Sequence, residues 1–176
     1  MDKVKKITLP LSDEEIKELH AGDVVSLCGV VYTARDAAHK RFCEALSSGK
    51  SLPIDVKGAA VYYCGPTPTL DGEIIGSCGP TTSARMDDYT PAMLEAGLKV
   101  MIGKGKRSEK VNEAIKKHCA VYLVAIGGAG ALIKNKIVEN TPIAYEDLGC
   151  EAVHRLVFKD LQLLVACDCN GKSVLR

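Results

Sequence analysis

The stretch LKVMIGKGKRSEKVNEAIKKHCAVYLVAI, residues 98–126, decides the fold class. It begins with an apolar run at 98–103, which predicts a buried strand, and continues through the polar loop GKGKRS at 103–108. A helix is predicted over 108–117, and a second apolar run predicts another buried strand over 120–126. A strand, a helix and a further strand in this order are typical of domains in which helices cover a sheet.

The same alternation continues toward the N-terminus. Strands are predicted over 23–31 and 59–63, which are runs of β-branched and other apolar residues. Helices are predicted over 12–22, where Ser12 and Glu15 fit a capping box, over the Ala-rich segment 34–49, and over 86–95.

The stretch 64–83 contains three prolines and four glycines, so it is predicted to be a loop. Within it Cys-Gly-Pro-Thr occurs twice, at 64–67 and 78–81, which predicts two tight loops of similar build. A short helical piece is expected to open at 127–130. Further on, 137–145 is predicted to be extended, and the C-terminal segment alternates and carries an Asn-Gly turn, which favours terminal antiparallel strands.

These patterns predict an α/β fold with a mixed sheet, formed by a single domain over residues 1–176. The polar, glycine-rich loops are expected to gather at one end of the strands, as they do in open α/β sheets. Loops that are far apart in the sequence then become neighbours in space.

The charge balance excludes some classes of partner. Lys and Arg number 23 against 22 Asp and Glu, so the net charge is +1, whereas a nucleic-acid or anionic-membrane partner requires a basic excess. The N-terminus carries no apolar stretch of signal-peptide length, and the longest apolar region, 120–133, is interrupted by three glycines and is too short to span a bilayer. We therefore expect a soluble, cytoplasmic protein.

The eight cysteines show neither a Cys-x-x-Cys pair nor a spacing typical of zinc ligands. Several lie inside apolar runs, which predicts reduced thiols used as small buried hydrophobic residues, with no metal bound by this chain. Cys64 and Cys78 leave a thiol-redox role open, which requires both thiols to be exposed and low in pKa.

Three segments place cations in loops at predicted strand ends. Arg35 lies in TARDAAHK, Arg85 in GSCGPTTSARMD, and Lys104 in GKGKRS. Glycine-rich turns and helix N-termini offer N–H groups to anions, and arginine suits bidentate binding of a carboxylate or phosphate. If the three loops converge, they form an anion site.

Structural roles for the same residues remain open. GKGKRS lacks the spacing of a phosphate-binding loop and also fits a solvated basic turn. Arg35 and Asp36 also fit an ion pair at a helix start, and the hydroxyls at 81–83 fit helix caps. His39 fits a position on a helix face better than a catalytic position.

The string GSCGPTTSARMDDY, with TARDAAHKR upstream and GKGKRS downstream, closely resembles the β subunit of the class I fumarate hydratase and L-tartrate dehydratase family. That unit also occurs as the C-terminal domain of single-chain enzymes. The likeness covers nearly the whole chain. The family often has glycine where this chain has Ala84, and a small residue such as alanine where it has Cys78.

The resemblance implies a swivelling β/β/α domain and an oxygen-sensitive four-iron four-sulfur cluster held by three cysteines of a separate α subunit. The active site would form between the two subunits, with the cluster iron as a Lewis acid toward the substrate hydroxyl and one carboxylate. It further implies the following roles: Thr81 as the catalytic base, Arg35, Arg85, Lys104 and Thr82 as substrate-binding residues, and Asp87 and His39 as supporting residues.

The function implied is reversible dehydration of a C4 dicarboxylate, with malate and fumarate as the first choice. L-Tartrate or a related dicarboxylate is the nearest alternative, and a non-catalytic anion-binding or assembly domain is the alternative from another class. The expected partners are the α subunit that carries the cluster and a small dicarboxylate, in a hetero-oligomer that also leaves room for a homodimeric contact.

Overall fold

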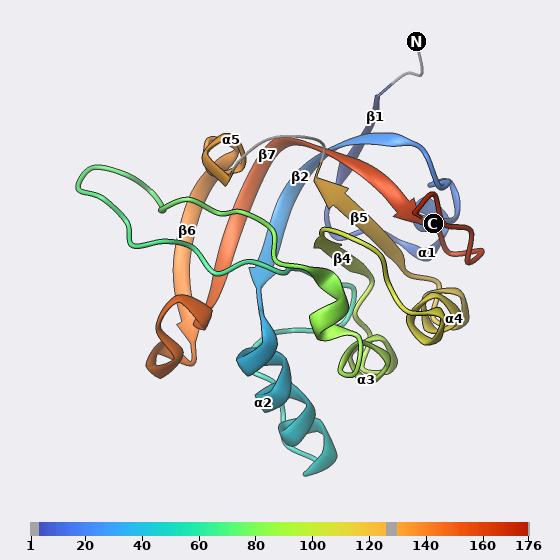
Figure 1. Ribbon diagram of the computed structural model, residues 1–176, viewed down its shortest axis with the longest axis horizontal. Coiled ribbons are helices and arrows are strands. Elements are labelled where there is room, and N and C mark those ends of the chain that lie inside the picture. The colour runs from blue at the N-terminus through green and yellow to red at the C-terminus, as the bar shows by residue number, and fades with distance from the viewer. Residues whose placement is uncertain (1–3, 126–129, 176) are drawn as a thin grey trace.

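The computed structural model describes residues 4–125 and 130–175, and Figure 1 shows how its elements are arranged. The strands are β1 (Lys5–Thr8), β2 (Val24–Thr33), β3 (Ala60–Tyr62), β4 (Val100–Gly103), β5 (Val121–Ala125), β6 (Ile137–Ala144) and β7 (Val153–Cys167). The helices are α1 (Asp13–Lys17), α2 (Asp36–Ser47), α3 (Thr90–Glu95), α4 (Glu109–Lys117) and α5 (Gly130–Lys134), with two 3₁₀ helices, η1 (Ser83–Met86) and η2 (Glu146–Glu151).

All seven strands belong to one mixed sheet in the order β1-β2-β3-β4-β5-β7-β6. Strands β1 to β5 run parallel to their neighbours, whereas β7 runs antiparallel to β2, β5 and β6. Because β7 pairs with β5 on one side and with β2 on the other, the sheet is partly closed as a barrel. The mixed-sheet α/β prediction is confirmed.

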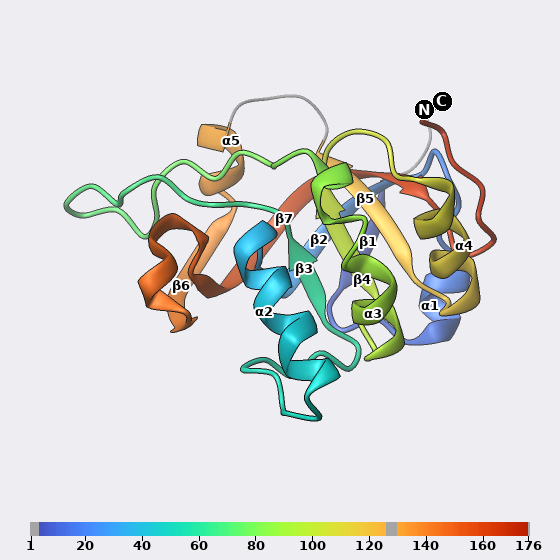
Figure 2. The same cartoon turned by 60° about the horizontal axis from the view of Figure 1, so that its bottom comes forward.

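Strands β3, β4 and β5 carry no charged residue, because helices and the rest of the sheet cover both of their faces. Tyr62, Ile102 and Leu123 belong to the core on one face of the sheet. Tyr63 and Tyr122 belong to a second core on the other face, together with apolar residues of α2, α3 and α4. Figures 1 and 2 show these three helices on the same side of the sheet.

Two predicted elements differ from the structure. The helix expected over 86–95 is split into η1 and α3, because Pro91 at the start of α3 lacks an N–H and its ring clashes with the carbonyl of a preceding turn. The expected terminal hairpin is a single 15-residue strand, β7, followed by the Asn170-Gly171 turn and one isolated bridge between Cys167 and Ser173. The strand continues because β2, β5 and β6 all pair with it.

The other predicted elements are present with shifted ends. The capping box at Ser12 and Glu15 forms as expected at the start of α1. The short helix expected at 127–130 begins at Gly130 as α5, and positions 126–129 lie outside the described residues. In the described part of the chain, no helix combines the length and apolar character that crossing a membrane requires.

The carboxyl ends of β2, β3 and β4 meet at one edge of the sheet, because these strands are parallel neighbours. Arg35 follows β2, Tyr63 follows β3, and Lys104 follows β4. Ligands of α/β proteins bind outside the carboxyl ends of such strands. This edge is therefore the place to look for a site.

Candidate functional site

An open hollow of about 520 Å³ lies between the start of α2 and the segments that carry η1 and η2. Arg35 and Arg85 both line it, although 50 positions separate them in the sequence. Asp36 connects them: its Oδ1 accepts a hydrogen bond of 2.9 Å from Arg85 Nε, and its Oδ2 lies 3.7 Å from an Arg35 nitrogen. The complete lining is Arg35, Asp36, Ala37, Lys40, Arg85, Tyr89, Leu148, Cys150 and Glu151.

Arg35 is the N-cap residue of α2, and its guanidinium lies near two carboxylates, those of Asp36 and Glu151. Its Nε lies 3.1 Å from Glu151 Oε1, but the two groups are too poorly aligned for a hydrogen bond. Asp36 Oδ2 is likewise buried without a hydrogen-bond partner among the described residues. Buried polar atoms without hydrogen-bond partners are uncommon, so these two atoms set Arg35 and Asp36 apart from ordinary surface ion pairs. Arg85 is more open, with 54% of its side chain exposed.

Thr81, Thr82 and Lys104 lie together on the neighbouring strand ends. The Thr81 N–H donates to the Tyr63 carbonyl at 2.6 Å, which fixes this threonine beside the end of β3. Thr82 forms a parallel bridge with Lys104. Ser83 completes the pairing, since its N–H donates to the Lys104 carbonyl at 2.9 Å and its Oγ accepts from the Lys104 N–H at 3.1 Å.

Gly103, at the end of β4, allows the Thr81–Ser83 segment to pass close to this strand. A Cβ at Gly103 would overlap Ser83 Oγ and lie 2.8 Å from the Tyr63 ring, so a side chain at the end of β4 would push the Thr81–Ser83 segment away.

The loop 64–80 runs between the arginines of the hollow and the strand ends that carry Thr81 and Lys104. Cys64 forms an antiparallel bridge with Pro80, the residue before Thr81. The next residue, Gly65, packs against Arg35: a Cβ there would lie 3.1 Å from Arg35 Cδ and 2.9 Å from the Cys150 carbonyl oxygen. The structure therefore brings all three predicted cation-bearing loops to one edge of the sheet. Of the predicted ligands, only Arg35 and Arg85 line the hollow itself.

The two predicted supporting residues are not exposed to the hollow. His39 is fully buried, and its Nδ1 lies 2.8 Å from the Arg35 carbonyl oxygen. Burial lowers the pKa of His39 to about 4, so its imidazole is neutral at pH 7. Asp87 Oδ1 accepts from Arg107 Nε at 2.7 Å, and Asp87 Oδ2 accepts from the Ser108 N–H at 2.7 Å. Both residues support the backbone of the loops and do not reach the hollow.

Sequence reasoning missed three partners of these residues. Glu151 faces Arg35 from η2, and no motif pointed to a carboxylate 116 positions downstream. Tyr63, directly after β3, and Tyr122, in β5, contact the GKGKRS loop, and the sequence had indicated only buried strand residues at both positions. The one available signal was a tyrosine within an apolar run, because a buried tyrosine hydroxyl usually needs a hydrogen-bond partner.

The cysteines are all free thiols. Four are buried (Cys64, Cys78, Cys167 and Cys169), three are half-buried, and Cys150 is exposed. A side-chain hydrogen bond to Cys78, and then burial, raise the pKa of Cys64, whereas the same bond lowers the pKa of Cys78. The thiol-redox alternative required two exposed thiols of low pKa, and this pair does not meet that requirement.

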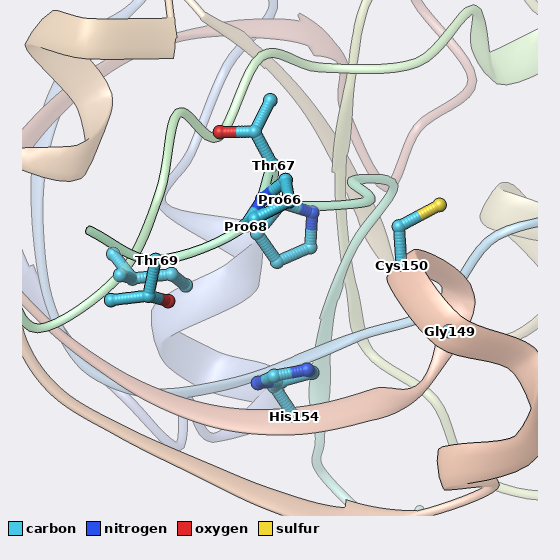
Figure 3. Close-up of a pocket in the computed structure, with 8 residues that line it drawn as sticks. Pro66, Thr67, Pro68, Thr69, Gly149, Cys150 and His154 are labelled. Carbon is cyan, nitrogen blue, oxygen red and sulfur yellow. The ribbon is translucent and has the colours of Figure 1, made fainter. Parts of the chain in front are cut away.

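A second pocket of about 280 Å³ adjoins the hollow through Cys150. Figure 3 shows Pro66 and Pro68 on one side of it and His154 on the other. His154 Nδ1 lies 2.6 Å from Asn140 Oδ1, and burial lowers the pKa of this imidazole. The pocket thus extends the hollow with a mostly apolar wall and a neutral imidazole.

Comparison with known proteins identifies the family. The chain matches the family described as Fumarase C-terminus over residues 1–176. It belongs to the Fumarase C-terminus family. The resemblance seen in the three motifs is thereby confirmed for the whole length of the chain.

Relatives of this Fumarase C-terminus chain include proteins named fumarate hydratase and a protein named as a tartrate dehydratase subunit beta. Fumarate hydratase 2 of Leishmania major is 36% identical over 163 residues, covering 92% of this chain and 29% of that protein. The aerobic class I fumarate hydratase of Escherichia coli (strain K12) is 36% identical over 151 residues, which cover 85% of this chain and 28% of that protein. The putative L(+)-tartrate dehydratase subunit beta of Methanocaldococcus jannaschii is 35% identical over 170 residues, which cover 93% of this chain and 87% of that protein. The chain thus spans less than a third of these two fumarate hydratases.

The resemblance implies an iron–sulfur cluster in the enzyme. Among residues 4–125 and 130–175, no three His, Cys, Asp or Glu side chains come close enough to hold a metal ion. The described residues of this Fumarase C-terminus chain therefore do not fit a cluster.

Proposed function

We propose that this chain is the β-type part of an iron–sulfur-dependent hydro-lyase that reversibly dehydrates a C4 dicarboxylate, with malate and fumarate as the first choice. The observation that carries the proposal is the meeting of Arg35 and Arg85 around Asp36 at the carboxyl ends of the parallel strands. Membership of the Fumarase C-terminus family supports it. In this proposal the cluster belongs to an α-type partner chain, and this chain supplies cations and a hydroxyl.

The two arginines are suited to hold the substrate carboxylates. A guanidinium offers five N–H donors in a planar fork, and each arginine uses only part of its fork on Asp36 and Glu151. Removing a proton next to a carboxylate builds a second negative charge on that carboxylate. Fixed cations stabilise that charge most in the transition state, where it is largest.

Thr81 is the proposed base that takes this proton at its Oγ1. An alcohol is a poor base unless neighbouring positive charge stabilises its alkoxide. Thr82 is bridged to Lys104, so the segment that carries Thr81 also holds the lysine loop in place. This arrangement supports Lys104 as the cation that assists Thr81 and binds the substrate.

A specific observation favours tartrate as the alternative substrate. The putative L(+)-tartrate dehydratase subunit beta is 35% identical over 93% of this chain, so a relative named for tartrate resembles it about as closely as the fumarate hydratases do. The word subunit in that name supports the proposal that an α-type chain is the partner.

The finer structural and cellular assignments are part of the same proposal. The partly closed sheet with α2, α3 and α4 on one face supports the swivelling β/β/α fold. Eight free thiols support a reducing, cytoplasmic setting. A crystal structure of the complex with the α-type chain would test the fold assignment, and fractionation of the source cells would test the compartment.

The decisive experiment is anaerobic co-expression with an α-type chain, followed by assays with malate, fumarate and tartrate. Thr81→Ala should lower kcat about 100- to 10,000-fold, the range for losing a positioned base, while Thr141→Ala on the exposed face of β6 should have no effect. Arg85→Lys should lower kcat/KM about 10- to 100-fold because an ammonium cannot replace a planar fork.

Arg155→Lys is the matched control for Arg85, since Arg155 also pairs with a carboxylate, Glu139, but lies away from the hollow. If the wild-type complex is inactive on all three substrates, the chain is better described as a non-catalytic anion-binding domain. Near-wild-type kcat in Thr81→Ala would reject the assignment of the base.

A further inference from the structure

A buried guanidinium lies behind the candidate site. Arg107 belongs to the GKGKRS loop, but it is 4% exposed while Lys104, Gly105 and Lys106 are exposed. Burying a charge is costly unless it is paired and hydrogen-bonded. The loop is therefore a solvated basic turn only in its first half.

All three nitrogens of Arg107 have partners. Nε donates to Asp87 Oδ1 at 2.7 Å, and one terminal nitrogen donates to Thr90 Oγ1 at 2.6 Å. The other terminal nitrogen donates to the Tyr63 hydroxyl at 3.2 Å. The guanidinium carbon also lies 5.3 Å from the centre of the Tyr63 ring and 5.0 Å from that of Tyr122, within cation–π range.

These partners come from two of the segments around the site, and Arg107 itself comes from a third. Tyr63 follows β3 and its carbonyl holds the Thr81 N–H. Asp87 and Thr90 follow η1, the short helix that carries Arg85. Arg107 itself lies three residues after Lys104. One side chain thus joins the loop of the proposed base to the loop of the proposed lysine.

A second connection runs through Tyr122. Its hydroxyl lies 2.8 Å from both Ser83 Oγ and the Gly105 carbonyl oxygen. Ser83 in turn accepts the Lys104 N–H and donates its own N–H to the Lys104 carbonyl. Because Arg107 lies against the Tyr122 ring, it sets the position of the tyrosine that connects the two loops.

We infer that Arg107 is a positioning residue that fixes the loop of Thr81 and Arg85 against the loop of Lys104. It does not touch the substrate, because it is buried behind Tyr63 and Tyr122. Its planar fork can reach Asp87, Thr90 and Tyr63 together, which a lysine ammonium cannot do. The link to catalysis rests on the function proposed above, whereas the link between the two loops does not.

The first test measures the loops directly by amide hydrogen exchange on the full chain. In Arg107→Lys, the amides of Ser83 and Lys104 should exchange about 10-fold faster or more, because the contacts that hold them are weakened. The Leu9 amide, which donates to the Cys28 carbonyl on another part of the sheet, should keep its exchange rate. Unchanged exchange at Ser83 and Lys104 would overturn the inference.

Tyr122→Phe provides a second variant that keeps the ring and removes only the hydroxyl. It should speed exchange at the same two amides even if Arg107→Lys does not fold. Arg41→Lys is the matched control, because Arg41 also pairs with a carboxylate, Asp147, and lies 5.0 Å from the centre of a tyrosine ring. If the amides of Ser83 and Lys104 exchange at the same rate in both variants, the inference is also overturned.

The second test measures catalysis in the complex with the α-type chain. A displaced base and lysine reduce the rate of the chemical step, so Arg107→Lys should lower kcat about 10- to 100-fold. KM should rise by a smaller factor, because Arg85 and Lys104 also bind the substrate in this proposal. An unchanged kcat in a complex whose wild type is active would overturn the positioning role. If the wild-type complex is inactive, the proposed function fails, and the exchange experiment alone decides whether Arg107 joins the loops.

Discussion

The burial of His39, whose ring contacts the Arg35 carbonyl oxygen, should make the stability of the fold depend on pH. Its imidazole is enclosed by aromatic rings of Phe42, Tyr63 and Tyr89, with ring centres 5.4 to 6.2 Å away. Its Nδ1 lies against the Arg35 carbonyl oxygen, and its Nε2 has no hydrogen-bond partner among the described residues. A charge on this ring would have no water around it.

The size of the effect follows from the pKa. Burial, the largest cause, lowers the pKa of His39 from 6.5 to about 4; the positive charge of Arg107 also lowers it, whereas the Arg35 carbonyl and Asp36 oppose the shift. Each pKa unit corresponds to about 1.4 kcal/mol, so protonation of His39 costs the folded protein about 3 kcal/mol. Because the folded state has the lower pKa, this stability is complete above pH 6.5 and is lost as the pH falls from 6.5 to about 4.

The assay is urea unfolding followed by far-UV circular dichroism, at several pH values between 7 and 4. His39→Asn keeps an N–H donor near the Arg35 carbonyl but cannot gain a proton. The free energy of unfolding of the wild type should therefore fall by about 3 kcal/mol more than that of His39→Asn over this range. His20→Asn, at an exposed position, is the control and should follow the wild type. Parallel curves for wild type and His39→Asn would refute the reasoning.

Two further predictions concern stability. Gly103→Ala should destabilise the fold by about 1–3 kcal/mol because its Cβ would overlap Ser83. Gly79→Ala should cost less than about 1 kcal/mol, because the nearest atoms beyond its chain neighbours lie 4.0 Å from the added Cβ. Chemical denaturation of both variants decides this. Ser12→Ala removes the Oγ that accepts from the Glu15 N–H, while the backbone N–H of residue 12 can still donate to Glu15 Oε2. It should lower the free energy of unfolding by about 1 kcal/mol, against less than about 0.5 kcal/mol for Ser47→Ala at the exposed end of α2, and equal losses would contradict the capping role.

The sequence predicted the secondary structure well wherever the signal was local. The capping box starts α1, and the apolar runs became β2, β3, β4 and β5, because strand and helix formation depend on neighbouring residues. It also placed Arg35, Arg85 and Lys104 in loops at strand ends. That placement followed from the alternation of elements and required no knowledge of contacts.

Tertiary structure decided which charges face each other. Nothing local marked Glu151 as the carboxylate beside Arg35, or Asp36 as the bridge to Arg85, because these contacts exist only once β2, β3 and η2 are packed together. The same holds for Arg107, which the sequence groups with exposed lysines and the fold buries between two tyrosines. Local sequence patterns determined the helices, the strands and the loops. Whether a cation is exposed or buried depended on residues distant in the sequence, because a buried charge is stable only where other segments supply its hydrogen bonds.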